Sequence, residues 1–500
     1  MSSHLKAFVV VLVLSSIAIL LSKHVFQRTA SQKEFSNRRN LWFALTSIAF
    51  LSYNIWVCFF LSAIVLLIAQ ARDSNRVAIY FFSMFAIPAI AVDIPGFGII
   101  NYLFSLDHLR LLSIVVLLPA FVALSLDTKT SKFGSLLPDK LLIAFIAMNI
   151  FITIGIYSFT GTLRRTTLYF IDIVLPYYVA SRSLRTTRDF QGALSAFIIP
   201  ALILSLIGVF EAAKGWQLYR SLVETFGVGW DLMTSLRRGE LLRGVASTGQ
   251  AIVHGYVVSI GIGFYLYAQH HVKSRSLHLI TASILALGLA SSLSRGPWIG
   301  CLATLLVFAF LSRNPWQTIS RYFLVGLGVF AAILVSPYGS SLIDYLPFVG
   351  TVEEGNITYR QYLLEVSASI FLQNPLFGSV YALYDPSLEE LRQGQGIIDI
   401  VNTYIPIALS TGLFGLGLFL STFAWVFLGI FRHLARASNE DDHRLGRAIF
   451  ATLAGILVTV FTVSSISVIP YVYWATLGVG VAYLKYPRNA QENEMPKENA

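Results

Sequence analysis

Apolar runs long enough to cross a lipid bilayer recur along almost the whole chain, and each needs about twenty residues at the helical rise. Of the 500 residues, 56% are hydrophobic and only 12% are charged. The mean hydropathy is +0.69, which a soluble domain of this length does not carry. The sequence therefore predicts an all-α polytopic integral membrane protein.

The apolar runs predict about 12–14 transmembrane helices. They are expected near residues 5–22, 41–70, 78–93, 108–125, 140–157, 166–180, 191–211, 251–269, 278–293, 297–312, 322–337, 410–431, 448–465 and 471–484. The first of them resembles a retained span, because no small-residue cleavage site follows it. Four parts result: helices over 1–337 with an outward loop near 212–250, a large loop at 338–409, C-terminal helices over 410–486, and a polar tail at 487–500 that we expect to be disordered.

Basic residues fall in short loops between the apolar runs, and most share one side if the helices alternate. The positive-inside rule assigns that side to the cytoplasm, so the C-terminus is expected there and the large loop outside. Topology thus accounts for the net charge of +10, and no nucleic-acid partner is expected. One basic segment, 23–40, does not follow the positive-inside rule if the helices simply alternate. Either it lies outside, or 41–70 is a bent hairpin about Ser52-Tyr53-Asn54, which places 23–40 inside and the N-terminus outside.

The usual motifs for ATP hydrolysis, zinc hydrolysis and a serine nucleophile elbow do not occur in the sequence. Cys58 and Cys301 both lie in apolar runs, which supports neither a disulfide framework nor a thiolate metal site. We therefore expect neither a metal nor a cofactor. Any chemistry has to use arginines, carboxylates and hydrogen bonds.

Two arginine-containing corners are the first candidates. Arg295 stands in Ser-Ser-Leu-Ser-Arg-Gly-Pro-Trp between two apolar helices on the outward side, where an arginine is costly unless it anchors at the interface or faces a polar cavity. Arg243 belongs to the basic outward loop that enters the next helix at Ser247-Thr248-Gly249-Gln250. The planar fork of arginine suits phosphate oxygens, and helix N-termini add positive potential. An ordinary interfacial anchor and an ordinary wet loop are the competing interpretations.

The large loop supplies the other candidates. Arg360 opens an amphipathic helix and either binds an anion or pairs with a nearby glutamate. Asp399 and Asn402 are spaced to share one helical face at the mouth of a span. Asp399 either caps that helix or, beside an apolar entry, acts as a base. The intramembrane polar residues Asn54, Asp172 and His254 are expected mainly to make helix-packing hydrogen bonds.

Together these stretches resemble the bacterial O-antigen ligase and O-antigen polymerase superfamily over roughly residues 210–432. The resemblance is carried by Arg-Gly-x-x-Ser-Thr-Gly-Gln at 243–250, Ser-Arg-Gly-Pro-Trp-Ile-Gly at 294–300, Asn-Pro-Leu-Phe-Gly at 374–378, Asp-x-x-Asn-x-Tyr at 399–404 and Gly-Leu-Phe-Gly-Leu-Gly-Leu-Phe at 412–419. It implies an all-helical glycosyltransferase of the bacterial inner membrane. Such an enzyme takes a glycan from an undecaprenyl-pyrophosphate carrier at the outer face of that membrane.

The resemblance also implies roles for individual residues. Arg243, Arg295 and Arg360 would bind the pyrophosphate, with Arg295 and Arg360 catalytic as well, since positive charge stabilises the leaving group. Asp399 would be the base, and the glycan would contact a further set of loop residues: Gln395, Asn402 and Tyr404.

One position departs from the ligases of the family, which carry a histidine immediately before the asparagine that opens the late helix. Here that position is Val401, which cannot take a proton. We therefore favour a polymerase of exopolysaccharide or O-antigen repeat units over a ligase that transfers glycan to lipid A core or another acceptor. A lipid-linked glycan flippase or secondary transporter is the alternative from another class, although the polar clusters lie at the outer mouths of the helices. Besides membrane lipid, expected partners are a chain-length regulator and a flippase.

Overall fold

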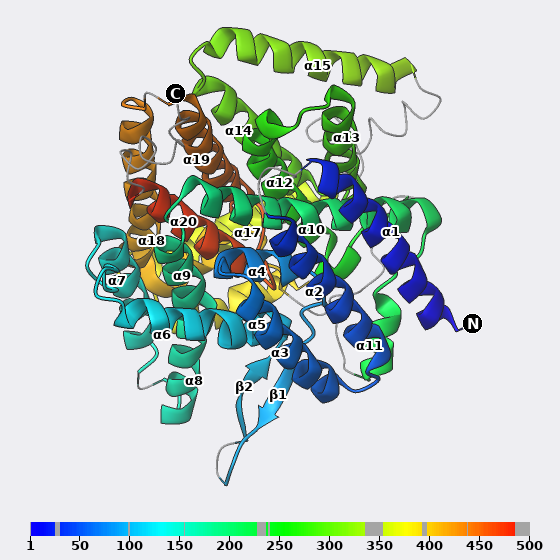
Figure 1. Ribbon diagram of the computed structural model, residues 1–500. Coiled ribbons are helices and arrows are strands. Elements are labelled where there is room, and N and C mark those ends of the chain that lie inside the picture. Colours follow the sequence, from blue (N-terminus) through cyan, green and yellow to red (C-terminus); the bar gives the residue numbers. More distant parts are fainter. Residues whose placement is uncertain are drawn as a thin grey trace.

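The computed structural model describes residues 2–25, 31–98, 101–154, 156–227, 237–238, 241–335, 354–392, 398–437 and 439–485. Over these residues the chain is a bundle of helices with two short antiparallel β hairpins (Figure 1). This confirms the predicted all-α polytopic fold. The predicted tail at 487–500 lies outside the described residues.

The first half of the chain forms helices α1 to α11. Their bounds, with those of the first hairpin, are α1 (Ser3–Val25), α2 (Gln32–Leu51), α3 (Ile55–Arg72), α4 (Arg76–Ser83), β1 (Val92–Pro95), β2 (Tyr102–Leu106), α5 (His108–Leu112), α6 (Leu118–Leu126), α7 (Leu137–Phe151), α8 (Phe159–Tyr169), α9 (Leu175–Ser183), α10 (Thr187–Lys214) and α11 (Arg220–Phe226). Single π-helical turns join α5 to α6 and α8 to α9.

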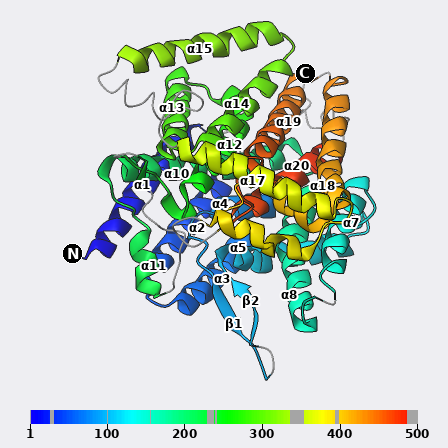
Figure 2. The same cartoon turned by 180° about the vertical axis from the view of Figure 1, so that it is seen from behind.

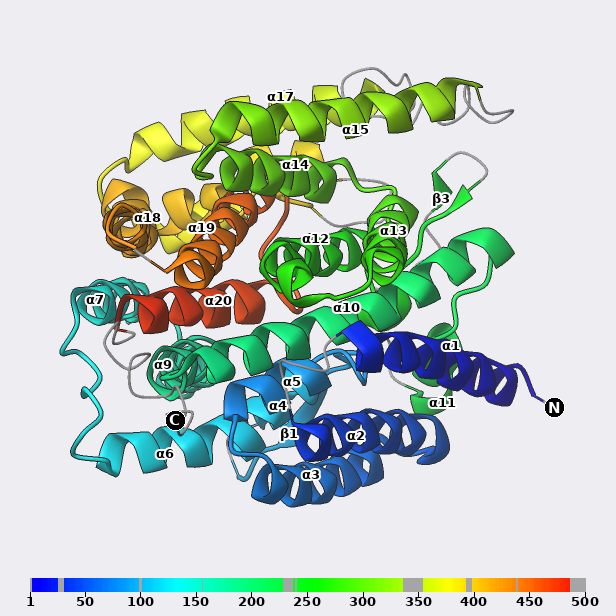
Figure 3. The same cartoon turned by 45° about the horizontal axis from the view of Figure 1, so that its top comes forward.

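The second half begins with the small hairpin of β3 (Arg237–Arg238) and β4 (Leu241–Leu242). The helices that follow are α12 (Ala251–Ala268), α13 (Arg275–Ser291), α14 (Arg295–Phe310), α15 (Pro315–Val335), α17 (Glu354–Gln373), the 3-10 helices η6 (Val380–Tyr384) and η7 (Pro386–Leu391), α18 (Tyr404–Leu434), α19 (Glu440–Val460) and α20 (Ile469–Lys485). Helix α15 lies beside α14 at the edge of the molecule (Figure 3).

Seven segments of the described chain are long and apolar enough to cross a membrane, so the protein is a multi-pass membrane protein. They are Ser3–Lys23, Ile55–Arg72, His108–Leu126, Thr187–Lys214, Ala251–His271, Tyr404–Leu434 and Glu440–Val460. Helices α13 and α14 are apolar but shorter. The helix expected near 78–93 ends early, at Ser83, because Pro88 interrupts the run; the β1–β2 hairpin follows and projects from the bundle.

The structure favours the bent hairpin for residues 41–70. Helix α2 ends at Leu51, α3 begins at Ile55, and Asn54 caps α3 by accepting hydrogen bonds from two backbone N–H groups. Glu34 pairs with Arg188 (3.3 Å), and Arg38 donates to the carbonyl of Gly192 (3.1 Å). The start of α2 therefore lies at the same end of the bundle as the first turns of α10, which follow the basic loop.

Helices α14 and α19 approach one another backbone to backbone. A Cβ atom built on Gly300 would lie 2.9 Å from the carbonyl oxygen of Gly455, and one on Gly455 would lie 2.7 Å from that of Gly300. Farther along the same contact, Gly296 faces Thr462. Small residues at this spacing let two membrane helices pack closely. The contact fixes Arg295, the first residue of α14, against the end of α19.

The large loop has a hydrophobic core of its own and lies across one face of the bundle (Figure 2). Helix α17 and the two 3-10 helices meet the beginning of α18 in a cluster of apolar side chains: Leu363, Val366, Ile370, Ala382, Leu388, Leu391 and Leu409.

Helix α18 is kinked at Gly412, whose φ of 63° and ψ of −163° are not helical. The Asn-Pro-Leu-Phe-Gly segment packs into this kink. The N–H of Leu413 donates to the backbone carbonyl of Pro375 (2.9 Å). A Cβ atom on Gly378 would lie 2.6 Å from the carbonyl oxygen of Leu409. The motifs at 374–378 and 412–419, far apart in the sequence, thus form one structural unit.

A buried ion pair gives a first test of this arrangement. Arg38 and Asp73 are 2.7 Å apart, with side-chain exposures of 4% and 0%. Arg38→Ala leaves the aspartate buried without its partner, so we expect the free energy of unfolding to fall by about 3–5 kcal/mol. Thermal unfolding of the purified protein in detergent measures this. Arg39→Ala is the matched control, since Arg39 is exposed and bonds only to the adjacent Asn40 among the described side-chain hydrogen bonds; equal losses for the two variants would contradict the pairing.

Candidate functional site

The connection between α19 and α20, residues 461–468, is the point at which the candidate segments meet. The N–H and hydroxyl of Thr403 donate to the carbonyls of Val460 (2.9 Å) and Val463 (2.7 Å). Arg360 donates to the carbonyl of Thr462 (3.4 Å), and the Ser464 hydroxyl donates to the carboxylate of Asp399 (2.8 Å). Two distant parts of the large loop are therefore held by one short connection.

Arg243 is joined to the turn that precedes α14. Its Nε donates to the carbonyl of Ser292 (3.2 Å), and one terminal nitrogen donates to the hydroxyl of Ser294 (2.6 Å). Ser294 directly precedes Arg295, which is partly buried at the start of α14. The structure thus brings the loop around Arg243 to the turn before Arg295. The next residue, Gly296, contacts Thr462, and the carbonyl of Thr462 accepts the hydrogen bond from Arg360.

A buried carboxylate holds the Arg243 loop in place. Glu211 of α10 is fully buried and accepts hydrogen bonds from the N–H groups of Leu218 (2.9 Å), Val245 (2.9 Å) and Ala246 (2.8 Å). Gly244 lies directly on α10, because a Cβ atom there would be 2.6 Å from the carbonyl oxygen of Gly208. A buried carboxyl group inside the bundle therefore binds the loop backbone, and a glycine permits the close approach.

Backbone strain is concentrated in these segments. Of the four non-glycine residues with positive φ in the described chain, three are Ala246 (48°), Leu293 (46°) and Ser467 (49°). They lie in the Arg243 loop, in the turn before Arg295 and in the α19–α20 connection. Residues held in the left-handed region cost free energy and cluster at functional sites. Their distribution supports a site built from these three segments.

The predicted helical face for Asp399 and Asn402 is wrong. Residues 398–402 are not helical, and α18 begins only at Tyr404 with Thr403 at its N-cap. The helix starts late because the Asn402 side chain accepts the N–H of Tyr404 (2.8 Å) and Thr403 is bound to the α19–α20 connection. Asp399 does not cap the helix; its action as a base remains a prediction.

The remaining predicted contacts are placed as follows. The Tyr404 hydroxyl donates to the carbonyl of Leu457 in α19 (2.8 Å), which ties α18 to its neighbour. Gln395 lies outside the described residues. His254 makes the expected packing contact, with Nε2 3.1 Å from the carbonyl oxygen of Gly288. Asp172 pairs with Arg110 (3.0 Å) and so links α5 to the turn between α8 and α9.

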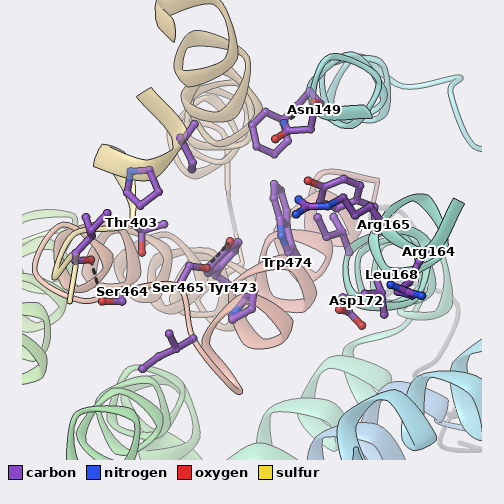
Figure 4. A pocket seen from close by; sticks show the side chains of 18 of the residues that line it. Asn149, Arg164, Arg165, Leu168, Asp172, Thr403, Ser464, Ser465, Tyr473 and Trp474 are labelled. Atoms are coloured by element: carbon purple, nitrogen blue, oxygen red, sulfur yellow. Dashed lines mark hydrogen bonds between the residues drawn. The ribbon is translucent and has the colours of Figure 1, made fainter. Parts of the chain in front are cut away.

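A cavity of about 850 Å³ opens beside the α19–α20 connection (Figure 4). Polar groups of Asp399, Thr403, Ser464 and Ser465 line one side. Arginines of α8 and aromatic residues of α20 line the rest, together with residues from β2, α7 and the segment between α7 and α8; they include Tyr102, Asn149, Tyr157, Arg164, Arg165, Tyr169, Asp172, Tyr473 and Trp474. A volume within the usual range of about 300–1,000 Å³ suits a small-molecule ligand.

Several lining residues were not predicted as site residues. The pair Arg164 and Arg165 did carry a signal, because alternating helices place it on the outward side, against the positive-inside rule. Tyr359, whose hydroxyl donates to the backbone carbonyl of Asp399 (2.9 Å), precedes Arg360 in the sequence and had no signal of its own. Burial and the Asp399 carboxylate raise the pKa of Tyr359, so its hydroxyl stays protonated and remains a donor. Ser464, which lines the cavity, likewise had no signal in the sequence.

The arrangement combines positive charge with a hydrogen-bonded carboxylate. Arginines beside the turn before α14 suit the stabilisation of an anionic leaving group, and the carboxylate of Asp399 at the cavity suits proton transfer from a hydroxyl. Among the described residues, no group of three or more His, Cys, Asp or Glu side chains is placed to hold a metal ion.

The close contact at Gly244 yields a second prediction. In Gly244→Ala the new methyl group meets the backbone of α10 at Gly208, so the loop has to move and Arg243 shifts with it. We expect a loss of about 1–3 kcal/mol in stability, measured by thermal unfolding, and reduced activity. Gly417→Ala on α18 is the control, because a Cβ atom there meets nothing within 4 Å. An equal loss of stability in the two variants would show that the contact between Gly244 and Gly208 does not hold the loop in place.

Part of the chain matches a known protein family. Residues 280–420 match the family described as O-antigen ligase. A search of curated proteins found no match. The matched region contains Arg295, Arg360 and Asp399, together with the packed motifs at 374–378 and 412–419. Residues 280–420 are thus similar to the O-antigen ligase family, which supports the resemblance to the O-antigen ligase and polymerase superfamily found in the sequence.

Proposed function

We propose that the protein polymerises oligosaccharide repeat units carried on undecaprenyl pyrophosphate, at the periplasmic face of the bacterial inner membrane. The observation that supports this most directly is that Arg243 is bonded to the turn before Arg295, while Arg360 is bonded to the α19–α20 connection, which also holds Asp399 at the cavity. The three arginines are not among the residues that line the cavity itself. The carrier pyrophosphate is the leaving group of such a reaction, and arginine guanidinium groups stabilise it as charge develops. The C-terminus then lies in the cytoplasm with the other basic loops.

In the proposed reaction a hydroxyl of the acceptor sugar attacks the anomeric carbon of the donor glycan. The bond between that carbon and the carrier phosphate oxygen breaks, and the electron pair stays on the pyrophosphate, which the three arginines bind. Asp399 takes the proton of the attacking hydroxyl, and Ser464 orients the carboxylate. A glycosidic bond forms and the undecaprenyl pyrophosphate is released.

A ligase that transfers the finished glycan to another acceptor is the second candidate, and the matched family description supports it. Val401 argues against it, because a valine side chain cannot accept the proton of an acceptor hydroxyl. In the structure Val401 donates its backbone N–H to the carbonyl of Asp399 (2.9 Å); Asp399 lines the cavity, whereas Val401 is not among the lining residues. Asp399 is the titratable group that can replace the missing histidine.

The glycans of a strain lacking this protein test the proposal. We expect single repeat units to accumulate on the lipid carrier, accessible from the outer face, with no long polymer. Long polymer that stays on its carrier would indicate a ligase instead. Repeat units trapped on the inner face would indicate a flippase and contradict both.

Complementing that strain with Arg295→Ala should restore membrane-inserted protein but lower polymer formation about 100-fold or more, because one preorganised charge at the leaving group is lost. Arg392→Ala is the control: Arg392 is exposed and pairs with Glu389 three residues before it. Full activity of Arg295→Ala would contradict its assignment to the pyrophosphate.

Asp399→Asn keeps the size of the side chain and an oxygen that accepts the Ser464 hydroxyl, but it cannot take a proton. We expect the rate of polymerisation in membrane vesicles to fall about 10²- to 10⁴-fold with a normal level of protein. Asp385→Asn at the N-cap of η7 is the matched control in the same loop. An unchanged rate for Asp399→Asn would show that another group takes the proton.

A further inference from the structure

Two adjacent arginines of α8 face the cavity on the side away from the connection. Figure 4 shows Arg165 extending toward Trp474, with Thr403, Ser464 and Ser465 across the cavity. Arg165 stacks over the ring of Tyr157, with the guanidinium carbon 4.1 Å from the ring centroid, and Arg164 stacks over Tyr102 at 3.6 Å. Arg164 also donates to the carbonyls of Tyr102 (2.7 Å) and Leu103 (2.8 Å). Both guanidinium groups are therefore positioned by the surrounding structure.

Within the described residues, neither arginine forms an ion pair with a carboxylate. The nearest acidic group along the chain, Asp172, is engaged by Arg110 at 3.0 Å. An arginine that lacks a protein carboxylate but faces a ligand-sized cavity is suited to bind an anion from outside, since its fork of N–H groups matches a carboxylate or phosphate.

The charges that line the cavity indicate what kind of anion fits. Asp172 is balanced by Arg110, which leaves Arg164, Arg165 and Asp399. Two positive charges and one negative charge give a net charge of +1, which a monoanionic carboxylate neutralises and a dianionic phosphate exceeds. The rest of the wall is aromatic, with Tyr157, Tyr473 and Trp474 among the lining residues, and flat apolar rings suit the faces of sugar rings.

The large loop reaches this region as well. Hydrogen bonding to Tyr384 of η6, together with burial, raises the pKa of Tyr157. The ring on which Arg165 stacks is thereby connected to the large loop, which also carries the proposed base, Asp399.

We propose that Arg164 and Arg165 form a subsite for an acidic sugar, so that the glycan handled by this protein carries a carboxylate, as in a uronic acid or a pyruvate ketal. The subsite holds the acceptor glycan across the cavity from Asp399, with its carboxylate on the arginines and its attacking hydroxyl toward the base. This rests on the proposed function, and it adds to it the class of sugar and the two residues that select it.

The first test is the composition of the repeat unit that accumulates on the lipid carrier in the deletion strain. Mass spectrometry after release from the carrier should show a carboxylate-bearing sugar in every repeat unit. A neutral or solely phosphate-bearing repeat unit overturns the subsite while leaving the polymerase intact. If no lipid-linked repeat unit accumulates, the proposed function fails and the subsite fails with it.

The second test separates recognition of the sugar from recognition of the carrier. Membrane vesicles containing the full-length protein are assayed with the extracted repeat unit and with the same compound after its carboxylate has been reduced to an alcohol. For the double variant Arg164→Gln/Arg165→Gln, we expect KM for the native compound to rise at least about tenfold with little change in kcat. For the reduced compound, wild type and variant should have the same KM.

An equal loss with both compounds would mean that the two arginines bind the carrier pyrophosphate or serve the fold, and it would overturn the proposal. Arg188→Gln is the control, since Arg188 is exposed and pairs with Glu34 in the basic loops, away from the cavity. Arg164→Lys/Arg165→Lys keeps both charges and should recover part of the lost affinity for the native compound. Thermal unfolding of each variant, compared with wild type, identifies any general loss of stability.

Discussion

The close packing of α14 against α19 is the interaction on which the site depends. Gly300 and Gly455 bring the two backbones together where any side chain would collide, and Gly296 continues the contact to Thr462. Because a membrane offers little hydrophobic driving force between helices, such contact between small residues has to supply much of the association. It places Arg295 against the α19–α20 connection, and that connection in turn holds Arg360, Thr403 and Asp399. The two glycines of the Ser-Arg-Gly-Pro-Trp-Ile-Gly motif therefore position the arginine that precedes them.

Much of the fold could be predicted from hydropathy, because lipid requires helices wherever the chain crosses it. The hairpin at Ser52–Asn54 could not be predicted from the sequence, because the charges of 23–40 allowed two topologies. The ion pair between Glu34 and Arg188 distinguishes the two. The helix expected through residue 93 ends at Ser83, ahead of Pro88, and the chain continues to the β1–β2 hairpin. Hydropathy reports the environment of a segment; it does not report where a proline ends the helix within it.

The arginines of the candidate site could be proposed from the sequence, but its geometry could not. Arg295 stood out because charge in apolar surroundings is costly. Arg243 and Arg360 stood out as loop arginines close to the start of a predicted helix. The relation of Asp399 to Asn402 was predicted wrongly, since the periodicity of a helix was applied to residues that an Asx turn and the bonds of Thr403 keep out of it. Tyr359 and Ser464 act through tertiary contacts that leave no mark in the sequence. Arg164 and Arg165 did leave one, as an exception to the charge rule that oriented the rest of the chain.

The contact between Gly378 and Gly412 has a mechanical consequence. Because the Asn-Pro-Leu-Phe-Gly segment is bonded into the kink of α18, and the apolar cluster of the loop includes Leu409, α17, the 3-10 helices and residues 404–411 behave as a single rigid body. Widening the cavity from this side requires the whole body to turn, and the bonds of Thr403, Asp399 and Arg360 to the α19–α20 connection are the ones that must break. A movement that widens the cavity from this side would therefore also disturb the bonds that hold the candidate residues Arg360 and Asp399.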